Sequence, residues 1–493
     1  MHSPLLNQLL SAITVDPQSG SPLYLQAAEG LIRLIRQGKL KSGQKLPGSR
    51  ELALVWQLNR VTVNKAIEEL QTQGWLESFV GKGTFVASYL PENNPVALAN
   101  ASEHQGRTTA GFTIDTPAYL DPIPTGIDLA FRLDDGFPDP RLAPIQELYR
   151  AYRSQLQKTT LYNRFGSYNT PEGPVYYRTA LSRYLNETRG LNTTARQLLS
   201  IRGTVMGINL VCQGLIAMGD VVVSGIPGWG RAERNFLHAG ARHIGIPVDA
   251  HGLVVDELRK ICRKRRVRMV YVTPHHHYPT TVSMRLDRRL ELLQLAHEYG
   301  FILFEDDYDY DFHYKNRPLQ PLASEDTNGM VIYCGSFSKN FSPAFRMGYL
   351  SAPENVIEHL ARHRLLLDRQ GDHVLDNAMG ELLNEGTIQR YLRKALHTYH
   401  ARRDHFCQLL TTKLGQAVEF DIPEGGLSVW ARFDPAIPVD KLAERARRKG
   451  LFISNGLAHH YPGYSPNAIR LGFASSTESE LTQNIDILAR AIR

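Results

Sequence analysis

Residues 335–349 read GSFSKNFSPAFRMGY and directly follow a short apolar run, MVIYC. The run has the length and composition of a buried strand, so Lys339 is expected just past a strand end, where its amine can face a crevice. Ser336, Ser338 and Arg346 flank the lysine, and hydroxyls together with a guanidinium can bind a phosphate dianion. Taken alone, a Ser-x-Ser-Lys sequence is a weak signal, because most lysines are simply solvated. The interpretation therefore depends on the rest of the chain.

Similar apolar runs recur upstream and alternate with helix-like stretches. They lie at 220–224, 268–273, 301–304 and 330–334, and helical periodicity separates them, for example at 288–299. Strands that are apolar throughout and alternate with helices indicate a mostly parallel sheet covered on both faces. An α/β fold is therefore expected for this part of the chain.

A second polar stretch, EDDYDYD, continues the run at 301–304. Asp306 can keep a heterocyclic nitrogen protonated, and Tyr308 can hydrogen-bond a phenolate oxygen beside it. The alternative is an acidic loop or a site for a cation such as magnesium, because Glu305, Asp307, Asp309 and Asp311 lie close by in the sequence.

Two glycine-containing turns complete the set of pocket motifs. In IRGTVMGIN (201–209), Gly203 and Thr204 stand at the start of an apolar helix, where free backbone amides and the helix dipole suit a phosphate. In GIPGWGR (225–231), Trp229 offers a stacking face, although it is equally a core aromatic. A pyridoxal phosphate site has four requirements: an amine for a Schiff base, an acid for the pyridine nitrogen, a group of phosphate-binding residues and an aromatic face. The chain offers a candidate for each.

The N-terminal part forms a separate, compact pattern. Helical spacing predicts three helices and alternation around a glycine tip predicts a hairpin: helices at 25–35, 50–57 and 61–73, and strands at 75–80 and 84–87. Ser49 is expected to cap the second helix and Asn59 the third. Three helices and a hairpin make a winged helix-turn-helix.

Charge in this part suits a nucleic acid. Residues 21–90 hold nine Lys/Arg against five Asp/Glu, more than half of the net charge of +7 of the whole chain. DNA binding needs positive charge for phosphates and a helix whose polar side chains reach base edges. The third helix opens with NRVTVNK (59–65), as a recognition helix does, and Lys82 at the hairpin tip can enter the adjacent groove. For any single residue, a solvated charged face is the alternative.

This N-terminal part closely resembles the DNA-binding head of GntR-type regulators, on the motifs KLPGSRELA (45–53), RVTV (60–63) and GKGTFV (81–86). The resemblance implies DNA contacts by Ser49, Arg50, Arg60, Thr62 and Lys82. We add two residues from the opening turns of the third helix, Asn64 and Lys65. Gly48 stands where the family often has Ser, so the resemblance supplies no phosphate contact there.

The order and spacing of the pocket motifs resemble fold-type I aminotransferases, and with its head the chain resembles MocR-type regulators over almost its whole length. The resemblance implies that Lys339 forms the Schiff base with pyridoxal 5'-phosphate, that Asp306 pairs with the ring nitrogen and that Tyr308 pairs with the ring oxygen. It assigns the other cofactor contacts to Gly203, Thr204, Ser336, Ser338 and Arg346 for the phosphate, and to Trp229 for stacking, where many members have Tyr.

The same resemblance implies two further sites. Arg470, in NAIRLGF (467–473), stands where such proteins hold the carboxylate of an amino acid, and Arg231, His276 and Tyr278 are expected beside it. Tyr168 matches a tyrosine that crosses a homodimer interface to the cofactor of the other subunit.

One turn departs from the family pattern. Where the family usually has Ser-His-Gln-Tyr-Pro-Thr-Gly, this chain has HHHYPTT, with His275, His277 and Thr281 replacing Ser, Gln and Gly. These changes put the choice of effector in doubt without touching the Schiff base. A metal site is the alternative for the histidine run, but side chains of adjacent residues diverge on an extended strand. The basic run 260–268 is similarly either a second DNA patch or, as we favour, a solvated helix end.

Residues 89–125 are rich in Pro, Asn, Gly and Thr without a sustained period, which is typical of a linker. We therefore expect a winged helix-turn-helix domain at 20–88, a flexible linker at 89–125, and an aminotransferase-like domain for cofactor, effector and dimerisation at 126–493.

The remaining composition bounds the compartment. The four cysteines are scattered without a C-x-x-C pair, which argues against disulfides and a zinc site and for a reducing compartment. The N-terminus lacks the pattern of a signal peptide, and the most apolar window, 208–226, is broken by polar residues. We expect a cytoplasmic protein without a membrane segment or a bound metal.

Three functions agree with these observations. The first is a transcription regulator that binds operator DNA with repeated half-sites and senses pyridoxal phosphate or a small amino compound. The second is a working aminotransferase to which the head adds only control. The third is a head fused to a scaffold that only dimerises.

Overall fold

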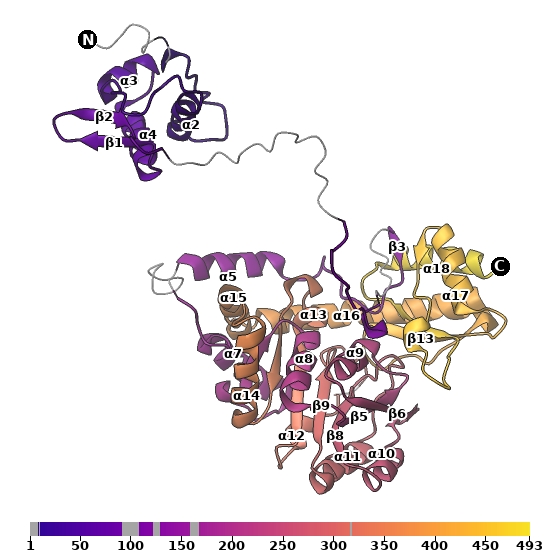
Figure 1. Ribbon diagram of the computed structural model, residues 1–493. Coiled ribbons are helices and arrows are strands. Elements are labelled where there is room, and N and C mark those ends of the chain that lie inside the picture. Colours follow the sequence, from indigo (N-terminus) through magenta and orange to yellow (C-terminus); the bar gives the residue numbers. More distant parts are fainter. Residues whose placement is uncertain (1–7, 9, 91–107, 122–128, 158–166, 316–317) are drawn as a thin grey trace. The chain divides into compact units, whose positions relative to one another are not determined.

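The computed structural model describes residues 8, 10–90, 108–121, 129–157, 167–315 and 318–493. They belong to two compact units, Met1–Ile114 and Asp115–Arg493, which we call the head and the large unit (Figure 1). The expected linker therefore lies partly outside the described residues.

The head has the three helices and the hairpin that the sequence predicts. They are α2 (Leu23–Arg36), α3 (Ser49–Val55), α4 (Arg60–Thr72), β1 (Leu76–Phe79) and β2 (Gly83–Val86). Leu31, Leu52, Val63 and Leu70 are fully buried, so the three helices pack on one apolar core. The head is a winged helix-turn-helix.

The two expected helix caps differ in outcome. The Asn59 side chain accepts a hydrogen bond from the Val61 amide at 2.9 Å and caps α4 as predicted. Ser49 was expected to cap α3, and this is wrong, because α3 begins at Ser49 itself and Gly48 is the N-cap without a side-chain bond. Ser49 lies in the first turn instead, where its hydroxyl is 3.4 Å from Arg60 Nε.

The large unit is built on an eight-stranded sheet with the order β4-β11-β10-β9-β8-β5-β6-β7. The strands are β4 (Leu198–Ile201), β5 (Val221–Ile226), β6 (Arg242–Asp249), β7 (Gly252–Leu253), β8 (Val267–Val272), β9 (Ile302–Asp307), β10 (Val331–Ser336) and β11 (Gly348–Ser351). The pairs from β10 to β6 are parallel, whereas β11 and β7 run antiparallel to their neighbours. The sheet is mostly parallel, as the sequence predicts from the runs that form β5, β8, β9 and β10, and the strands β4, β6, β7 and β11 are additions to that prediction.

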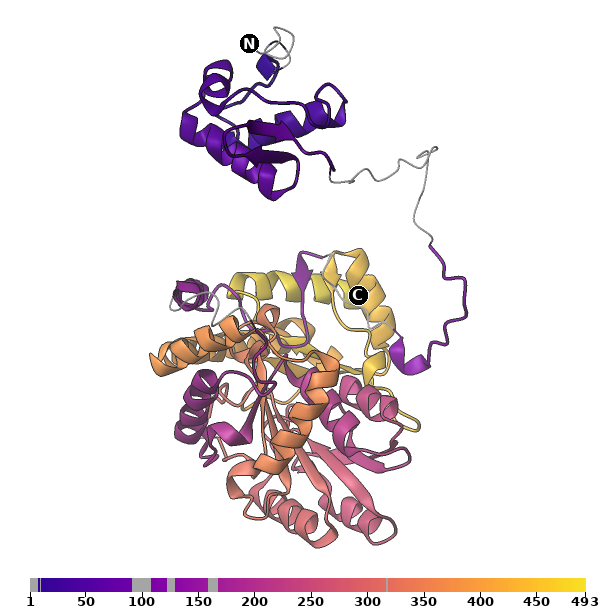
Figure 2. The same cartoon turned by 60° about the vertical axis from the view of Figure 1, so that its left-hand side comes forward.

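Helices cover both faces of this sheet (Figures 1 and 2). On one face, α8 (Thr204–Leu215), α9 (Gly230–His238) and α14 (Glu354–Leu367) pack on side chains such as Phe304. On the other, α10 (Val255–Cys262), α11 (Leu286–Tyr299) and α12 (Leu322–Glu325) pack on neighbours such as Leu303. Because side chains alternate along a strand, adjacent residues of β9 belong to different cores.

The rest of the large unit forms a further core around α16 (Thr387–Leu409). A three-stranded sheet of β12 (Val418–Glu419), β13 (Ser428–Phe433) and β15 (Ala468–Gly472) lies there, and β3 (Phe131–Arg132) pairs with β14 (Leu451–Phe452). The remaining helices are α5 (Ile145–Gln157), α7 (Val175–Arg189), α13 (Phe337–Asn340), α15 (His373–Asn384), α17 (Val439–Arg448) and α18 (Glu478–Ile492).

The last described part of the expected linker belongs to the large unit. A short 3-10 helix at Ala118–Leu120 lies beside α9, where Arg234 donates to the Asp121 carbonyl oxygen at 2.6 Å. The rings of Tyr119 and His238 lie 6.0 Å apart. This part of the chain is therefore attached to α9.

The cysteines and the helix lengths complete the description. Cys212, Cys262, Cys334 and Cys407 are all buried and unpaired. In the part of the chain that the structure describes, no helix has both the length and the apolar character needed to cross a membrane.

Candidate functional site

The candidate pocket lies where β9 and β10 end. The two strands are parallel and in register, with Asp306 opposite Cys334. Asp306 shares the face of Phe304, which is covered by α8, whereas Glu305 and Asp307 point to the other face. Of these three consecutive acids, only Asp306 therefore faces the N-terminus of α8, as the sequence interpretation requires.

Asp306 is buried and only partly satisfied. Its Oδ2 accepts a hydrogen bond from the Tyr271 hydroxyl at 2.7 Å, whereas its Oδ1 has no hydrogen bond of ordinary geometry among the described residues, although the Thr204 hydroxyl is near enough to lower the pKa of the carboxyl. Burial raises the pKa of this carboxyl to about 7, against the opposing effect of the Tyr271 hydroxyl. A protonated ring nitrogen is the kind of partner that would satisfy Oδ1 and favour the ionised carboxylate. The sequence did not point to Tyr271, because it lies inside the apolar strand β8.

Lys339 lies on α13, the single helical turn that follows β10. Its Nζ donates to the Gly136 carbonyl oxygen at 2.7 Å and lies 4.0 Å from the centroid of the Phe137 ring. Burial lowers the pKa of the Lys339 amine, against the opposing charges of Asp135 and Asp134. A lowered pKa raises the neutral, nucleophilic fraction of the amine. The segment containing Gly136 was not predicted as part of the site.

The residues predicted to hold a phosphate come together in part. Arg346 has a left-handed backbone (φ 52°), and its Nη2 donates to the Arg202 carbonyl oxygen at 2.7 Å. Its guanidinium lies so close to Gly203 that a Cβ there would be 3.0 Å from Nη2. Gly203 is the N-cap of α8 and Thr204 its first residue, so a cation meets a helix N-terminus here.

The two serines line the neighbouring turn. Ser336 is the N-cap of α13 and accepts from the Ser338 amide at 3.1 Å. The Ser338 hydroxyl is buried and has no hydrogen-bond partner among the described residues. An unpartnered hydroxyl beside Lys339 and an unpartnered carboxylate oxygen on Asp306 are what a bound pyridoxal phosphate would satisfy. The residues present therefore fit the cofactor.

Arg470 and Tyr278 also lie together, with an unforeseen partner. The Arg470 guanidinium stacks 4.7 Å from the centroid of the Tyr278 ring, and its Nη1 donates to the Pro279 carbonyl oxygen at 3.1 Å. Its Nε lies 2.9 Å from Asp135 Oδ1. The Trp229 ring packs edge-on at 6.4 Å from Tyr278, which places the expected stacking residue beside this group.

Other predicted residues have different surroundings. Arg231 is exposed. His276 is buried, with Nδ1 2.8 Å from Asp309 and Nε2 3.4 Å from His313, so an effector contact would require its ring to leave Asp309. Tyr308 donates to the His276 carbonyl oxygen at 2.8 Å.

Tyr168 is 70% exposed, with the Arg369 guanidinium 4.1 Å from its ring centroid. It makes no contact with Lys339 in the same chain. An exposed position is what a residue that reaches into another subunit requires.

The acidic stretch and the histidine run do not converge on a cation. Glu305 accepts from the Leu322 and Ala323 amides at 2.9 Å, and the other acids have separate partners. His275 Nε2 lies 2.6 Å from the Leu319 carbonyl oxygen and His277 Nε2 2.8 Å from that of Pro227. Among the described residues no three His, Cys, Asp or Glu side chains are grouped as metal ligands.

The predicted DNA contacts of the head lie around the start of α4 and on the wing. Ser49 and Thr62 are partly buried. The other five are exposed, namely Arg50, Arg60, Asn64, Lys65 and Lys82. Within the described part of the chain, none of the four cations among them has an ion-pair partner. Their charge is therefore available to phosphates.

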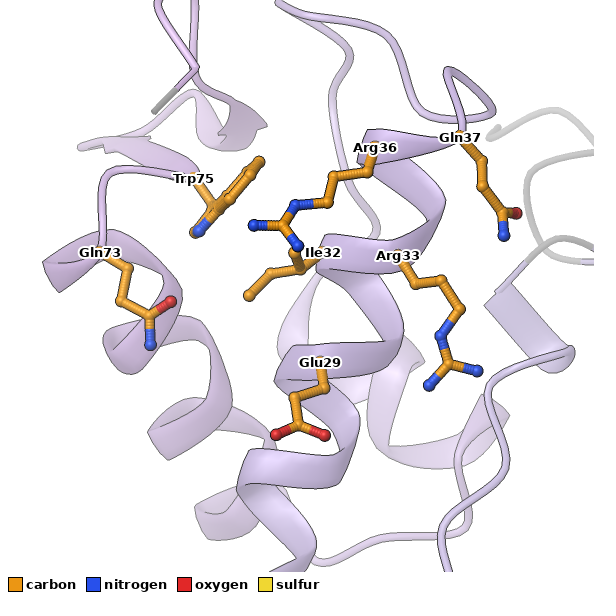
Figure 3. A pocket seen from close by; sticks show the side chains of 7 residues that line it. All are labelled: Glu29, Ile32, Arg33, Arg36, Gln37, Gln73 and Trp75. Atoms are coloured by element: carbon orange, nitrogen blue, oxygen red, sulfur yellow. The ribbon is translucent and has the colours of Figure 1, made fainter. Parts of the chain in front are cut away.

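The head also has a hollow of about 650 Å³ between α2 and the end of α4, shown in Figure 3. Glu29, Ile32, Arg33, Gln73 and Trp75 are among its lining residues, and the Arg36 guanidinium lies 5.3 Å from the Trp75 ring centroid. Gln73 follows the last turn of α4, whereas the predicted base-reading residues occupy its first turns. The hollow is therefore separate from the candidate DNA interface.

Two family models match this chain. The model "Aminotransferase class I and II" matches residues 140–488, and the model "Bacterial regulatory proteins, gntR family" matches residues 23–86. The matches correspond to the large unit and the head.

Similar proteins combine the same two parts. YdfD of Bacillus subtilis, described as an uncharacterized HTH-type transcriptional regulator, is 29% identical over 96% of both chains. The probable rhizopine catabolism regulatory protein MocR of Rhizobium meliloti is 26% identical over 97% of this chain and 95% of its own. Among solved structures, a multiple substrate aminotransferase from Thermococcus profundus is 26% identical, with a TM-score of 0.67 over 74% of this chain and 91% of its own.

Proposed function

Because this chain belongs to the aminotransferase class I and II family and carries a GntR-type DNA-binding head, we propose that it is a MocR-type transcription regulator that senses pyridoxal phosphate, an amino compound, or both. The observation that carries the proposal is the presence, on one chain, of a pocket with buried polar groups and a recognition helix with cations that have no partner among the described residues.

The residues that would hold the cofactor follow from the pocket. Gly203, Thr204, Ser336, Ser338 and Arg346 would bind its phosphate, and Trp229 would stack on its ring. The chemistry that pyridoxal phosphate supplies when bound is a reactive aldehyde and an electron-withdrawing ring.

The side chains of the chain itself supply the remaining chemistry. Lys339 presents an amine whose pKa is lowered by burial, so it bonds to an aldehyde more readily than a solvated lysine. Asp306 would hold the proton on the ring nitrogen through Oδ1, while Tyr271 fixes the orientation of its carboxylate through Oδ2. Tyr308 would donate to the ring oxygen once its hydroxyl turns away from the His276 carbonyl oxygen, to which it donates at 2.8 Å.

Regulation requires that both the ligand and the DNA bind two states of the protein with different affinities. A ligand can change DNA affinity only by binding one state of the large unit better than another.

We further propose a cytoplasmic homodimer whose two heads read repeated half-sites. Tyr168 supports the dimer, because it is exposed and lies beside Arg369, which follows the exposed Leu365, Leu366 and Leu367 on α14.

The test measures DNA binding by the full chain with and without pyridoxal phosphate. We expect the cofactor to change operator affinity at least ~10-fold, a coupling of about 1.4 kcal/mol, and Lys339→Ala to abolish the change. Lys315→Ala, which removes an exposed lysine on the large unit, should behave as wild type. Equal affinity under all conditions would remove the sensor function.

The catalytic alternative rests on one observation, that the sequence offers a candidate residue for each contact with the cofactor. Sustained conversion of an amino acid and a keto acid, at about one turnover per second or faster, would support it. The relatives that span the whole chain carry regulator names, which favours the regulator.

A further inference from the structure

The group that faces Arg470 is a carboxylate of the chain itself. Asp135 Oδ1 lies 2.9 Å from Arg470 Nε, an ion pair without hydrogen-bond geometry, and the Tyr278 hydroxyl donates to Asp135 Oδ2 at 3.2 Å. The Arg470 side chain is 3% exposed and that of Asp135 44% exposed. One carboxylate thus bridges the arginine and the tyrosine, with one side open to solvent.

The backbone on both sides of Asp135 is firmly held. Asp134 Oδ1 accepts from the Gly136 and Phe137 amides at 2.9 Å, and Asp134 Oδ2 accepts from the Ser475 hydroxyl at 2.6 Å. The Gly472 amide donates to the Asp134 carbonyl oxygen at 2.7 Å. These bonds fix the turn that directs Asp135 toward Arg470 and the Gly136 carbonyl toward Lys339.

We propose that Asp135 is an internal substitute for a ligand carboxylate, so that the pocket selects a primary amine without a carboxylate next to its amino group. This inference rests on the proposed function, in which an amino compound enters beside Lys339. An α-carboxylate that pairs with Arg470 must either displace Asp135 from Nε or share the guanidinium with it, and in both cases it meets a like charge. An amine without the carboxylate leaves the Asp135–Arg470 pair intact. Asp135 is thus a specificity-determining residue.

Energetics favour this selectivity. Arg470 is only 3% exposed, so removing its carboxylate partner would leave a buried positive charge uncompensated. Asp135 is 44% exposed, so solvent weakens the pair and the expected preference is moderate. We therefore expect at least ~10-fold discrimination against the carboxylate.

The first test uses the cofactor-loaded full chain and matched ligand pairs, phenylalanine with phenethylamine and lysine with cadaverine. The absorbance band of the bound cofactor reports binding of each. Wild type should bind each amine at least ~10-fold more tightly than the matching amino acid. In Asp135→Asn, the ratio of amine affinity to amino-acid affinity should be ~10-fold lower than in wild type. Equal affinity for both members in wild type, or an unchanged ratio in the variant, would overturn the proposal.

A second test removes the cofactor from the experiment. Calorimetry of the cofactor-free full chain with succinate should show binding to Asp135→Asn at least ~10-fold tighter than to wild type, and none once Arg470→Ala is added. Asp287→Asn is the matched control, because it removes an exposed carboxylate that is 3.1 Å from Arg285, and it should leave succinate binding unchanged. Equal succinate binding by Asp135→Asn and wild type would contradict the proposal.

Two checks separate the possible failures. Asp135→Ser is a second variant for the case that Asp135→Asn misfolds, which far-UV circular dichroism would detect. A protein that discriminates between the ligands but does not bind DNA would contradict the proposed function and leave the role of Asp135 standing.

Discussion

At the scale of single residues, the carboxyl of Asp306 is protonated more easily in the folded chain than in the unfolded chain. Burial raises its pKa from 3.8 to about 7. Between these values the folded cofactor-free protein holds a proton that the unfolded chain releases. Stability therefore falls as the pH rises from about 4 to about 7, and the loss is complete above the folded pKa.

Asp306→Asn should make stability less dependent on pH, because the amide does not ionise and its oxygen can still accept from Tyr271. From pH 5 to pH 8, the cofactor-free wild type should lose ~3 kcal/mol more than the variant. Thermal unfolding at the two pH values measures this difference. A parallel decline in wild type and variant would show that Asp306 already ionises in the folded chain near its ordinary pKa.

Individual site residues were predictable to different degrees. Lys339 and Asp306 each come just after a short apolar run in the sequence. Their position near the end of a strand could therefore be predicted without knowledge of the fold. Asp135 could not be assigned in this way, because its turn meets the strand of Arg470 through the Gly472–Asp134 backbone bond, which joins segments far apart in the sequence. The Asp-Gly-x-Pro turn after β3 is the signal that could have drawn attention to it.

At the scale of elements, the wing and the start of α4 present the cations of the head. Lys82 lies at the tip between β1 and β2, exposed and without an ion-pair partner among the described residues. A phosphate contact should affect all DNA sequences alike, since phosphates carry no base identity.

Lys82→Ala should therefore weaken binding to operator and to random DNA by a similar factor, and it should reduce the slope of log K against log salt by about 1. Titrations at several salt concentrations measure the slope. The control is Arg33→Ala, which removes one exposed charge of the same sign from the hollow beside α2. A selective loss for the operator would instead mean that Lys82 reads bases.

Elements were predicted well where local patterns decide them. The parallel strands β5, β8, β9 and β10 are short apolar runs in the sequence, and each is a strand in the structure. β11 was not predicted, because its residues belong to the polar loop after Lys339 and become a strand only by pairing with β4 and β10. The cap of α3 shifted by one residue, because a serine can stand at the N-cap or within the first turn and the local sequence does not distinguish the two.

At the scale of the whole molecule, an exposed apolar group on α14 bears on assembly. Leu366 is 87% exposed, between Leu365 and Leu367, and Tyr168 is nearby through Arg369. Exposed apolar side chains that cluster in this way mark interaction surfaces.

Leu366→Asp should convert the proposed dimer into monomers, because it would bury a carboxylate in the interface. Light scattering after size-exclusion chromatography gives the mass. Leu290→Asp places the same charge on an exposed leucine of α11 and should leave the assembly unchanged. A dimeric Leu366→Asp variant would place the interface elsewhere, and a monomeric wild type would contradict the proposed dimer.

The burial of all four cysteines has a practical consequence. Burial raises the pKa of the Cys212 and Cys407 thiols to about 12 and that of Cys262 to about 11, and the Cys334 thiol is also raised. Since the thiolate is the reactive form, maleimide dyes at neutral pH will leave the native chain almost unlabelled. A cysteine introduced on the wing and another on an exposed turn of the large unit will then carry the only fluorophores, so energy transfer between them can follow the movement of the head as the pocket fills.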